Sequence, residues 1–230
     1  MDARIASPAR VTPRDAGTLL LLDTSGQQPR VLMGRRHARL AFMANLFVFP
    51  GGRVDPQDAL LRGISDLPPP DHLRAALGAS RRRARAMALA ALRETFEEAG
   101  LAIGEPGTFE PSGESWTAFA AHGLRPDLSA LRLVARAITP PGAPRRFDTR
   151  FFAIVGDQGF SASRRAQPSG ELGELCWPTL DEALQLPIPD ITRLILEHLV
   201  ARLRADPGLQ PGGPALFFRQ SRGKRLNTLL

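Results

Sequence analysis

The apolar residues of this chain are gathered in short runs, and turn-forming residues separate one run from the next. Runs of this length predict strands at residues 16–23, 31–35, 131–138, 150–155 and 171–177, and an edge strand near residues 215–219. We expect the first two strands to form a hairpin, because Ser25, Gly26 and Pro29 lie between them.

A longer alanine-rich segment, residues 80–99, has the period of a helix. Ser80 is in position to cap the N-terminus of this helix and Gly100 to end it. Asp71 is expected to cap a short helix that ends near Gly78, with the prolines before it outside the helix. Two more helices are predicted at residues 179–186 and 190–204. Strands interrupted by helices in this order predict a mixed sheet with helices on its faces.

The composition, 43% hydrophobic and 23% charged residues, is typical of a soluble globular protein. No apolar run approaches the roughly 18 residues of a membrane span. The N-terminus also lacks the apolar core of a secretory signal, so we expect a cytoplasmic protein without a membrane partner. Residues 1–14 are predicted to be a flexible arm, and residues 15–230 a single domain.

The net charge of +7 raises the question of an anionic partner. Lys224 is the single lysine among the thirty basic residues, which indicates a compositional bias toward arginine, with a general anion-binding surface as the alternative. Tyrosine is absent, and no aromatic and basic residues alternate as in proteins that stack nucleic-acid bases. Nucleic acid is therefore not the expected partner. The lone cysteine, Cys176, excludes an internal disulfide and a multi-cysteine zinc site, so any metal here is expected to have oxygen ligands.

Three carboxylates stand out in the long helix. Glu94, Glu97 and Glu98 are spaced at i, i+3 and i+4, so they share one helix face, on which like charges repel. A hard divalent cation would offset this repulsion, because Mg²⁺ and related ions take oxygen ligands. A solvated acidic face is the alternative. Upstream, Gly51 and Gly52 after Pro50 predict a bend where backbone comes close to a ligand or to the helix.

These residues resemble the Nudix box of the Nudix hydrolase superfamily. Gly52 matches the first glycine of the signature, and its second half is matched by Arg93, Glu94, Glu97, Glu98, Gly100 and Leu101. Asp58 stands where the signature has its first glutamate. Between Asp58 and Arg93 lie 34 residues where the signature has seven, so we expect a split box at residues 52–101 with an insertion at about residues 59–85. Such a split box, with residues 146–152 and 171–177, is similar to the coenzyme A diphosphatase branch of the superfamily.

The resemblance implies an α+β fold, the Nudix α/β/α sandwich with a mixed β-sheet between helices. It also implies metal-dependent hydrolysis of the pyrophosphate bond in a nucleoside diphosphate linked to another group, with Mg²⁺ or Mn²⁺ as cofactor. The implied catalytic residues are Arg93, Glu94, Glu97 and Glu98, and the implied metal ligands are the same glutamates with Glu171, or else Glu174. Asp58 would be the loop carboxylate, braced by Arg93. Candidate substrate-binding residues are Arg35, Arg36, Gly51, Gly52, Arg82 and Arg83.

Several alternatives stay open at this point. Coenzyme A or an acyl-CoA is the first expected substrate, and ADP-ribose and NADH are the next. Arg82 and Arg83 are read either as a clamp for an extra phosphate or as a solvated helix start. From a different class, the fold could serve as a nucleotide-sensing module without turnover. Trp116 and Trp177 are expected in the core rather than stacked on a base. A homodimer through residues 190–204 is also open, although core packing explains that helix equally well.

Overall fold

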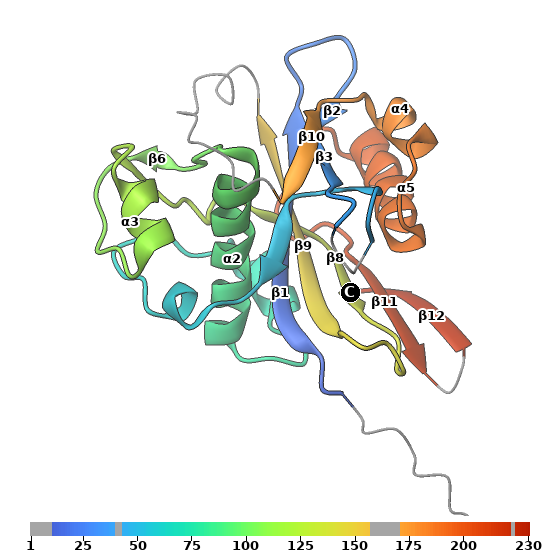
Figure 1. Cartoon of the computed structure of the whole chain (residues 1–230), viewed down its shortest axis with the longest axis horizontal. Coiled ribbons are helices and arrows are strands. Elements are labelled where there is room, and N and C mark those ends of the chain that lie inside the picture. The colour runs from blue at the N-terminus through green and yellow to red at the C-terminus, as the bar shows by residue number, and fades with distance from the viewer. Residues whose placement is uncertain (1–10, 40–42, 157–170, 222–223) are drawn as a thin grey trace, which may run out of the picture.

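The structure, a computed structural model of the chain, describes residues 11–39, 43–156, 171–221 and 224–230 (Figure 1). Within these residues the largest sheet has seven strands in the order β12-β11-β8-β9-β1-β2, with β5 also paired to β1. Its strands are β1 (Arg14–Asp23), β2 (Arg30–Val31), β5 (Gly51–Arg53), β8 (Arg132–Ile138), β9 (Phe147–Gly156), β11 (Leu216–Ser221) and β12 (Lys224–Leu229). β1 runs parallel to β9 and β11 parallel to β8, whereas β8 and β9 are antiparallel. The sheet is therefore mixed, as the sequence predicts.

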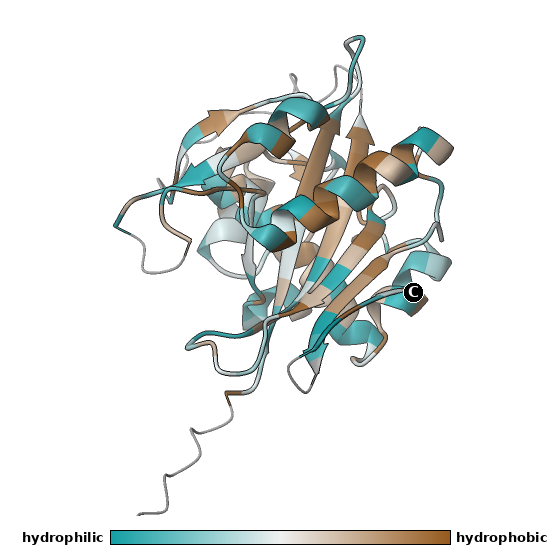
Figure 2. Cartoon of the chain, turned by 90° about the vertical axis from the view of Figure 1, so that its right-hand side faces the viewer, coloured by the Kyte–Doolittle hydropathy of each residue, from teal (hydrophilic) through white to brown (hydrophobic). Residues whose placement is uncertain are grey.

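Helices cover both faces of this sheet (Figure 1). The long helix α2 (Arg81–Ala99) lies on one face, and α4 (Leu180–Gln185) and α5 (Asp190–Ala205) lie on the other. In Figure 2 the apolar side of α5 is turned toward the apolar strands. The α/β/α sandwich expected from the sequence is thus confirmed. No helix in the described ranges combines the length and apolar character needed to cross a membrane.

The leucine run of β1 supplies both cores of the sandwich. Leu19 and Leu21 pack with the α2 core, and Leu20 and Leu22 pack with the α5 core, because successive strand residues point to opposite faces. All four are fully buried. A continuous apolar run is what a strand covered on both faces requires.

Helix α2 packs unusually close to β1. A Cβ on Gly17 would lie 1.9 Å from the carbonyl oxygen of Met87, so only glycine fits at this crossing. The helix begins and ends where the sequence predicts: the Ser80 side chain accepts a hydrogen bond from the Arg83 amide, and Gly100 has φ 69°. The face of α2 that carries the three glutamates is not simply a solvated acidic face, since Glu98 is buried.

The remaining described elements are shorter. A small sheet has the order β10-β3-β4, and two strands pair as β6 with β7. The bounds are β3 (Met33–Arg36), β4 (Phe47–Val48), β6 (Glu105–Pro106), β7 (Leu124–Arg125), β10 (Leu172–Cys176), α1 (Pro69–Ala75), α3 (Glu114–Ala120) and the 3-10 helix η1 (Pro56–Ala59). The expected segment at residues 171–177 is β10, which is mostly exposed and lies in this small sheet rather than in the core.

The predicted first hairpin forms, but it is only two residue pairs long, because the chain leaves β1 after β2 and joins the small sheet as β3. Two other local predictions are wrong. β11 is not an edge strand, since β12 pairs outside it. Helix α1 begins at Pro69. Prolines fit a first helical turn, where the missing N–H has no helical partner in any case.

Asp71 is also not the cap of α1. Its side chain is fully buried, and its carboxylate accepts hydrogen bonds from the amides of Leu133, at 2.8 Å, and Gly212, at 2.9 Å. Asp71 therefore joins α1 to β8 and to the segment before β11. At the N-terminus, β1 already begins at Arg14, and residues 1–10 of the expected arm lie outside the described residues.

Candidate active site

The glycine pair of β5 lies directly against the glutamates of α2. Gly51 and Gly52 pair with Thr18 and Gly17 of β1. A Cβ on Gly52 would lie 2.5 Å from the carboxyl carbon of Glu94, and the Gly51 amide donates a 2.9 Å hydrogen bond to Oε2 of Glu98. The absence of side chains here lets two α2 carboxylates pass the edge of the strand.

Asp58 and Arg93 form a buried ion pair behind these glutamates. The Arg93 guanidinium donates from Nε and Nη2 to the two oxygens of Asp58, at 2.9 and 3.1 Å. The Asp58 carboxylate also accepts from the Asp55 amide at 2.8 Å and from the indole Nε1 of Trp116 at 2.9 Å. Burial alone would lower the pKa of Arg93, but the hydrogen bonds and charge of Asp58 raise it above its ordinary value.

The same guanidinium also holds two of the predicted metal ligands. Nη1 of Arg93 donates to Glu94 at 2.9 Å and to Glu97 at 3.1 Å. Burial raises the pKa of Glu94 to about 7 and that of Glu98 to about 8. The loss of hydration on burial therefore destabilises both ionised carboxylates more than their hydrogen-bond partners stabilise them. A bound cation would favour the ionised forms.

A cleft of about 440 Å³ opens beside these residues. One end is polar and contains Arg36, Gly51, Gly52, Glu94, Glu98 and Glu171. The other end is apolar and is lined by side chains of β8, β9, α5 and β11, among them Phe147 and Phe218. The cleft therefore joins a charged region to an apolar one, as expected of a site for a molecule with both kinds of group.

The structure brings together six of the residues singled out in the sequence, and these are the six at the polar end. The others lie elsewhere. Glu97 does not line the cleft and is held by Arg93. Arg35 is 3.8 Å from Glu174 in an exposed ion pair, and neither residue lines the cleft. Arg82 is exposed at the start of α2.

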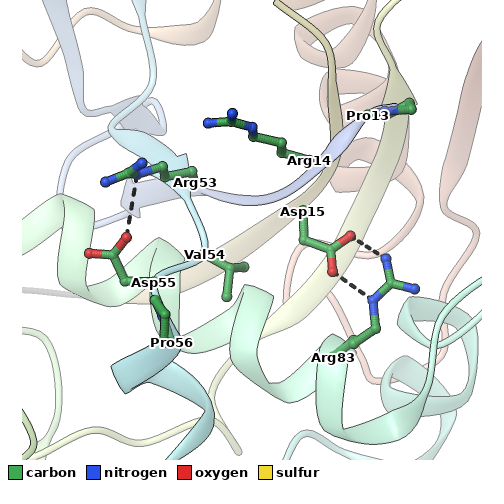
Figure 3. Close-up of a pocket in the computed structure, with 8 residues that line it drawn as sticks. All are labelled: Pro13, Arg14, Asp15, Arg53, Val54, Asp55, Pro56 and Arg83. Carbon is green, nitrogen blue, oxygen red and sulfur yellow. Dashed lines mark hydrogen bonds and ion pairs between the residues drawn. The ribbon is translucent and has the colours of Figure 1, made fainter. Parts of the chain in front are cut away.

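Arg83 lies on a second pocket, of about 550 Å³ (Figure 3). Its guanidinium donates two hydrogen bonds of 2.7 Å to the carboxylate of Asp15. Arg53 lines both this pocket and the cleft, and its side chain is 3.3 Å from Asp55. The two cavities therefore adjoin at Arg53.

Sequence reasoning missed several residues of the site. Arg145, Phe147 and Phe218 line the cleft, although they lie far from the box in the sequence. Trp116 is buried, as expected, but its indole N–H also donates a hydrogen bond to Asp58, which is 58 residues earlier in the sequence. No local pattern signals such a contact, because it depends on where α3 packs against α2.

The donor set of the cleft fits a hard divalent cation, since Glu94, Glu98 and Glu171 all offer carboxylate oxygens to the same space. Among the described residues, however, no three His, Cys, Asp or Glu side chains are gathered closely enough to hold a metal ion as they stand. In this arrangement Arg93 donates hydrogen bonds to Glu94 and Glu97, and the Gly51 amide donates one to Glu98.

An Arg-Glu helix motif beside a glycine pair, at the polar end of a cleft in a mixed-sheet sandwich, is the arrangement expected of a hydrolase of phosphoanhydride bonds. The structure is similar to a NUDIX hydrolase from Alicyclobacillus acidocaldarius, with a TM-score of 0.63 and 31% sequence identity over 83% of this chain and 92% of that chain. It is also similar in fold to the NUDIX domain of Shewanella oneidensis NrtR complexed with ADP ribose, with a TM-score of 0.50 and 14% identity over 84% and 90% of the two chains. No protein-family model and no curated protein matches the sequence.

The chain therefore belongs to the Nudix hydrolase family. It is a Nudix pyrophosphohydrolase, and enzymes of this family generally need divalent metal ions.

Proposed function

We propose that this chain hydrolyses the pyrophosphate bond of a nucleoside diphosphate linked to another group, using Mg²⁺ or Mn²⁺, and that coenzyme A or an acyl-CoA is the first substrate to test. The observation that carries the proposal is the polar end of the cleft, where Glu94, Glu98 and Glu171 line the same space beside Gly51 and Gly52. A bound divalent cation supplies charge neutralisation on the pyrophosphate and makes a water molecule more acidic.

The chain's own residues divide the remaining work. Glu94, Glu98 and Glu171 would provide oxygen ligands to the cation, and Glu97, which accepts a hydrogen bond from Arg93, would be the further helix ligand. One of the three helix glutamates, Glu94, Glu97 or Glu98, would accept the proton of the attacking water. Arg36, at the polar end, neutralises a phosphate oxygen. Arg93 remains bound to Asp58 and positions the helix carboxylates rather than contacting the substrate.

The metal roles are tested by Glu98→Gln, which keeps the shape of the side chain and removes its charge. We expect kcat to fall by at least a hundredfold and the Mg²⁺ concentration at half-maximal activity to rise. Glu174→Gln is the matched control, because this exposed glutamate lies outside the cleft. Full activity of Glu98→Gln would rule out the assignment.

The choice of coenzyme A follows the likeness of the split box, with its proposed insertion at residues 59–85, to the coenzyme A diphosphatase branch. The second pocket supports it, because Arg14, Arg53 and Arg83 face two carboxylates there and leave one excess positive charge next to the cleft (Figure 3). An extra phosphate of a long substrate would be attracted to that charge. Against this, Nε and Nη2 of Arg83 already donate to the carboxylate of Asp15, which neutralises part of the charge that a phosphate would need.

The phosphate clamp is tested by replacing Arg82 and Arg83 with alanine. Turnover of coenzyme A is expected to fall about tenfold relative to turnover of dephospho-coenzyme A, which lacks the 3′-phosphate. An equal loss on both substrates would show that these arginines have no role specific to the 3′-phosphate.

ADP-ribose is the second candidate substrate, favoured by the fold shared with the ADP ribose complex of the NrtR domain. A panel of coenzyme A, acyl-CoA, ADP-ribose and NADH, each with Mg²⁺ and with Mn²⁺, separates these possibilities. Binding without hydrolysis of any member would instead favour a nucleotide-sensing module. A single domain over residues 15–230 and a cytoplasmic location stay predictions.

The homodimer also stays a prediction, but the helix face on which it rested is occupied. Ile195, Leu196 and Leu199 of α5 are fully buried against the sheet, as core packing requires. The oligomeric state can be measured by light scattering, and a dimer would have to use another surface.

A further inference from the structure

The apolar end of the cleft is built by one row of small side chains across the main sheet. Ala16 of β1 pairs with Thr149 of β9, which pairs with Ala137 of β8, which in turn pairs with Phe218 of β11. Paired residues of neighbouring strands point to the same face. All four residues line the cleft.

Larger side chains surround this row. On β9, Phe147 and Phe151 stand two residues before and after Thr149, so they share its face. Both also line the cleft. The three small residues therefore form the floor of a notch whose walls are Phe147, Phe151 and Phe218. We call it the small-residue notch.

The notch extends along this row away from the glutamates, and Phe218 is its far end. Ala16 also pairs with Arg53 of β5, next to Gly52 and Glu94. From β5 to β11 the row crosses four strand intervals, which is roughly 19 Å at about 4.8 Å per interval. This span is longer than a diphosphate and leaves room for a sugar and a ring beyond it.

The chemistry of the notch selects a flat, uncharged ring. Its walls are aromatic, its floor is formed by two methyl groups and a threonine, and aromatic side chains favour stacked or edge contacts with other rings. Arg136 and Arg150 lie on the opposite face of the sheet, where they bond to Asp148 beneath α1. Arg53, at the glutamate end of the row, and Arg145, in the loop before β9, also line the cleft.

We propose that the small-residue notch binds the nucleobase of the substrate, so that the substrate lies across the sheet with its diphosphate at Glu94 and Glu98. This inference rests on the proposed function. It gives a role to the C-terminal strand β11, which follows the helices of the sandwich and supplies Phe218 as the far wall.

The chain offers a matched control in the neighbouring residue. Phe217 lies on the same strand but points to the other face, where the Arg136 guanidinium stacks on its ring at 4.7 Å. Phe217→Ala removes the same number of atoms from β11 as Phe218→Ala without changing the notch. Any loss due to loosening of the strand is common to both variants.

The test measures binding by calorimetry, with AMP, GMP, CMP and UMP as probes and ribose 5-phosphate as the probe without a base. We expect at least one mononucleotide to bind more tightly than ribose 5-phosphate. Phe218→Ala should weaken the binding of that mononucleotide about tenfold or more, in line with the usual contribution of base–aromatic stacking. The affinity for ribose 5-phosphate should stay unchanged. Phe217→Ala should change neither affinity beyond about twofold.

A second variant, Thr149→Leu, fills the notch from its floor. This variant should bind the mononucleotide no more tightly than ribose 5-phosphate, so it tests the notch even if Phe218→Ala fails to fold. Equal affinity of the wild-type protein for all five probes would overturn the proposal, as would equal losses in Phe217→Ala and Phe218→Ala. So would a loss in Phe218→Ala for an acyl-CoA but not for coenzyme A, because the notch would then hold the acyl chain. Absence of hydrolysis would sink the proposed function, while the binding data would still decide the notch.

Discussion

The buried ion pair between Asp58 and Arg93 allows the sharpest prediction about stability. Each oxygen of Asp58 accepts two hydrogen bonds, and the side chain is fully buried. Asp58→Asn would replace one oxygen with an NH₂ group that faces two donors. It would also leave the Arg93 charge, whose side chain is 3% exposed, without its main partner.

Removing one member of a buried ion pair typically costs about 3–5 kcal/mol. For a chain of this size, about 1 kcal/mol shifts the melting temperature by roughly 2–4 °C. We therefore expect Asp58→Asn to lower the melting temperature by about 10 °C. The assay is thermal unfolding followed by circular dichroism, in the presence of a chelator so that metal binding does not mask the change.

The control is Asp66→Asn, which breaks another Arg–Asp pair of similar length. Nε of Arg85 lies 3.0 Å from Asp66, but the Asp66 side chain is 66% exposed. Exposed pairs contribute about 0–1 kcal/mol, so this variant should shift the melting temperature by no more than about 3 °C. Similar shifts in the two variants would refute the reasoning, because burial would then not decide the strength of the Asp58–Arg93 pair.

Three further predictions follow from the site and its packing. Gly52→Ala places a Cβ 2.5 Å from the carboxyl carbon of Glu94, so we expect at least a tenfold loss of kcat in steady-state assays, whereas Gly173→Ala, with its nearest atom at 3.7 Å, should be neutral. Gly17→Ala places a Cβ 1.9 Å from the Met87 carbonyl oxygen, a backbone atom that cannot move aside as a flexible side chain could. We expect this overpacking to lower the free energy of unfolding by about 3 kcal/mol or more in urea titrations, and an unchanged midpoint would contradict this. Burial raises the pKa of Glu98 to about 8 from its usual 4.5, so the folded protein holds this proton longer than the unfolded chain does. The stability contribution is therefore present below about pH 4.5 and is lost as the pH rises toward about 8. Melting temperatures of the metal-free protein should fall over that range, and Glu98→Gln should flatten the decline.

The helix half of the box was readable from the sequence because its signals are local. Ser80 and Gly100 limit α2 where capping chemistry predicts, and the i, i+3, i+4 spacing of the glutamates is a property of any helix. The strand predictions at residues 16–23 and 131–138 likewise rest on apolar runs, and both segments form central strands. The errors occur where residues distant in the sequence determine a side chain's contacts. Asp71 is not a cap, because its carboxylate accepts hydrogen bonds from the amides of Leu133 and Gly212.

The composition of the cleft could not be read in this way. Glu97 looks equivalent to Glu94 and Glu98 in the sequence, yet it faces Arg93 and not the cleft. Phe218 looks like an ordinary strand residue, and only the pairing of β11 with β8 places it at the end of the small-residue notch. Such facts depend on strand register, and a shift of one residue would turn every side chain of β11 to the other face.

The sequence by itself determined a mixed sheet with helices on its faces, the caps of α2 and the presence of three carboxylates on one helix. These follow from periodicity, capping and like-charge spacing, which act within a few residues. Only the tertiary structure decided that Glu94 and Glu98 reach a cleft past Gly51 and Gly52, that Asp58 is held by Arg93 and Trp116, and that small residues from three strands form one notch. Those arrangements arise from packing between segments distant in the chain, where distance and register, rather than local pattern, set what each side chain can contact.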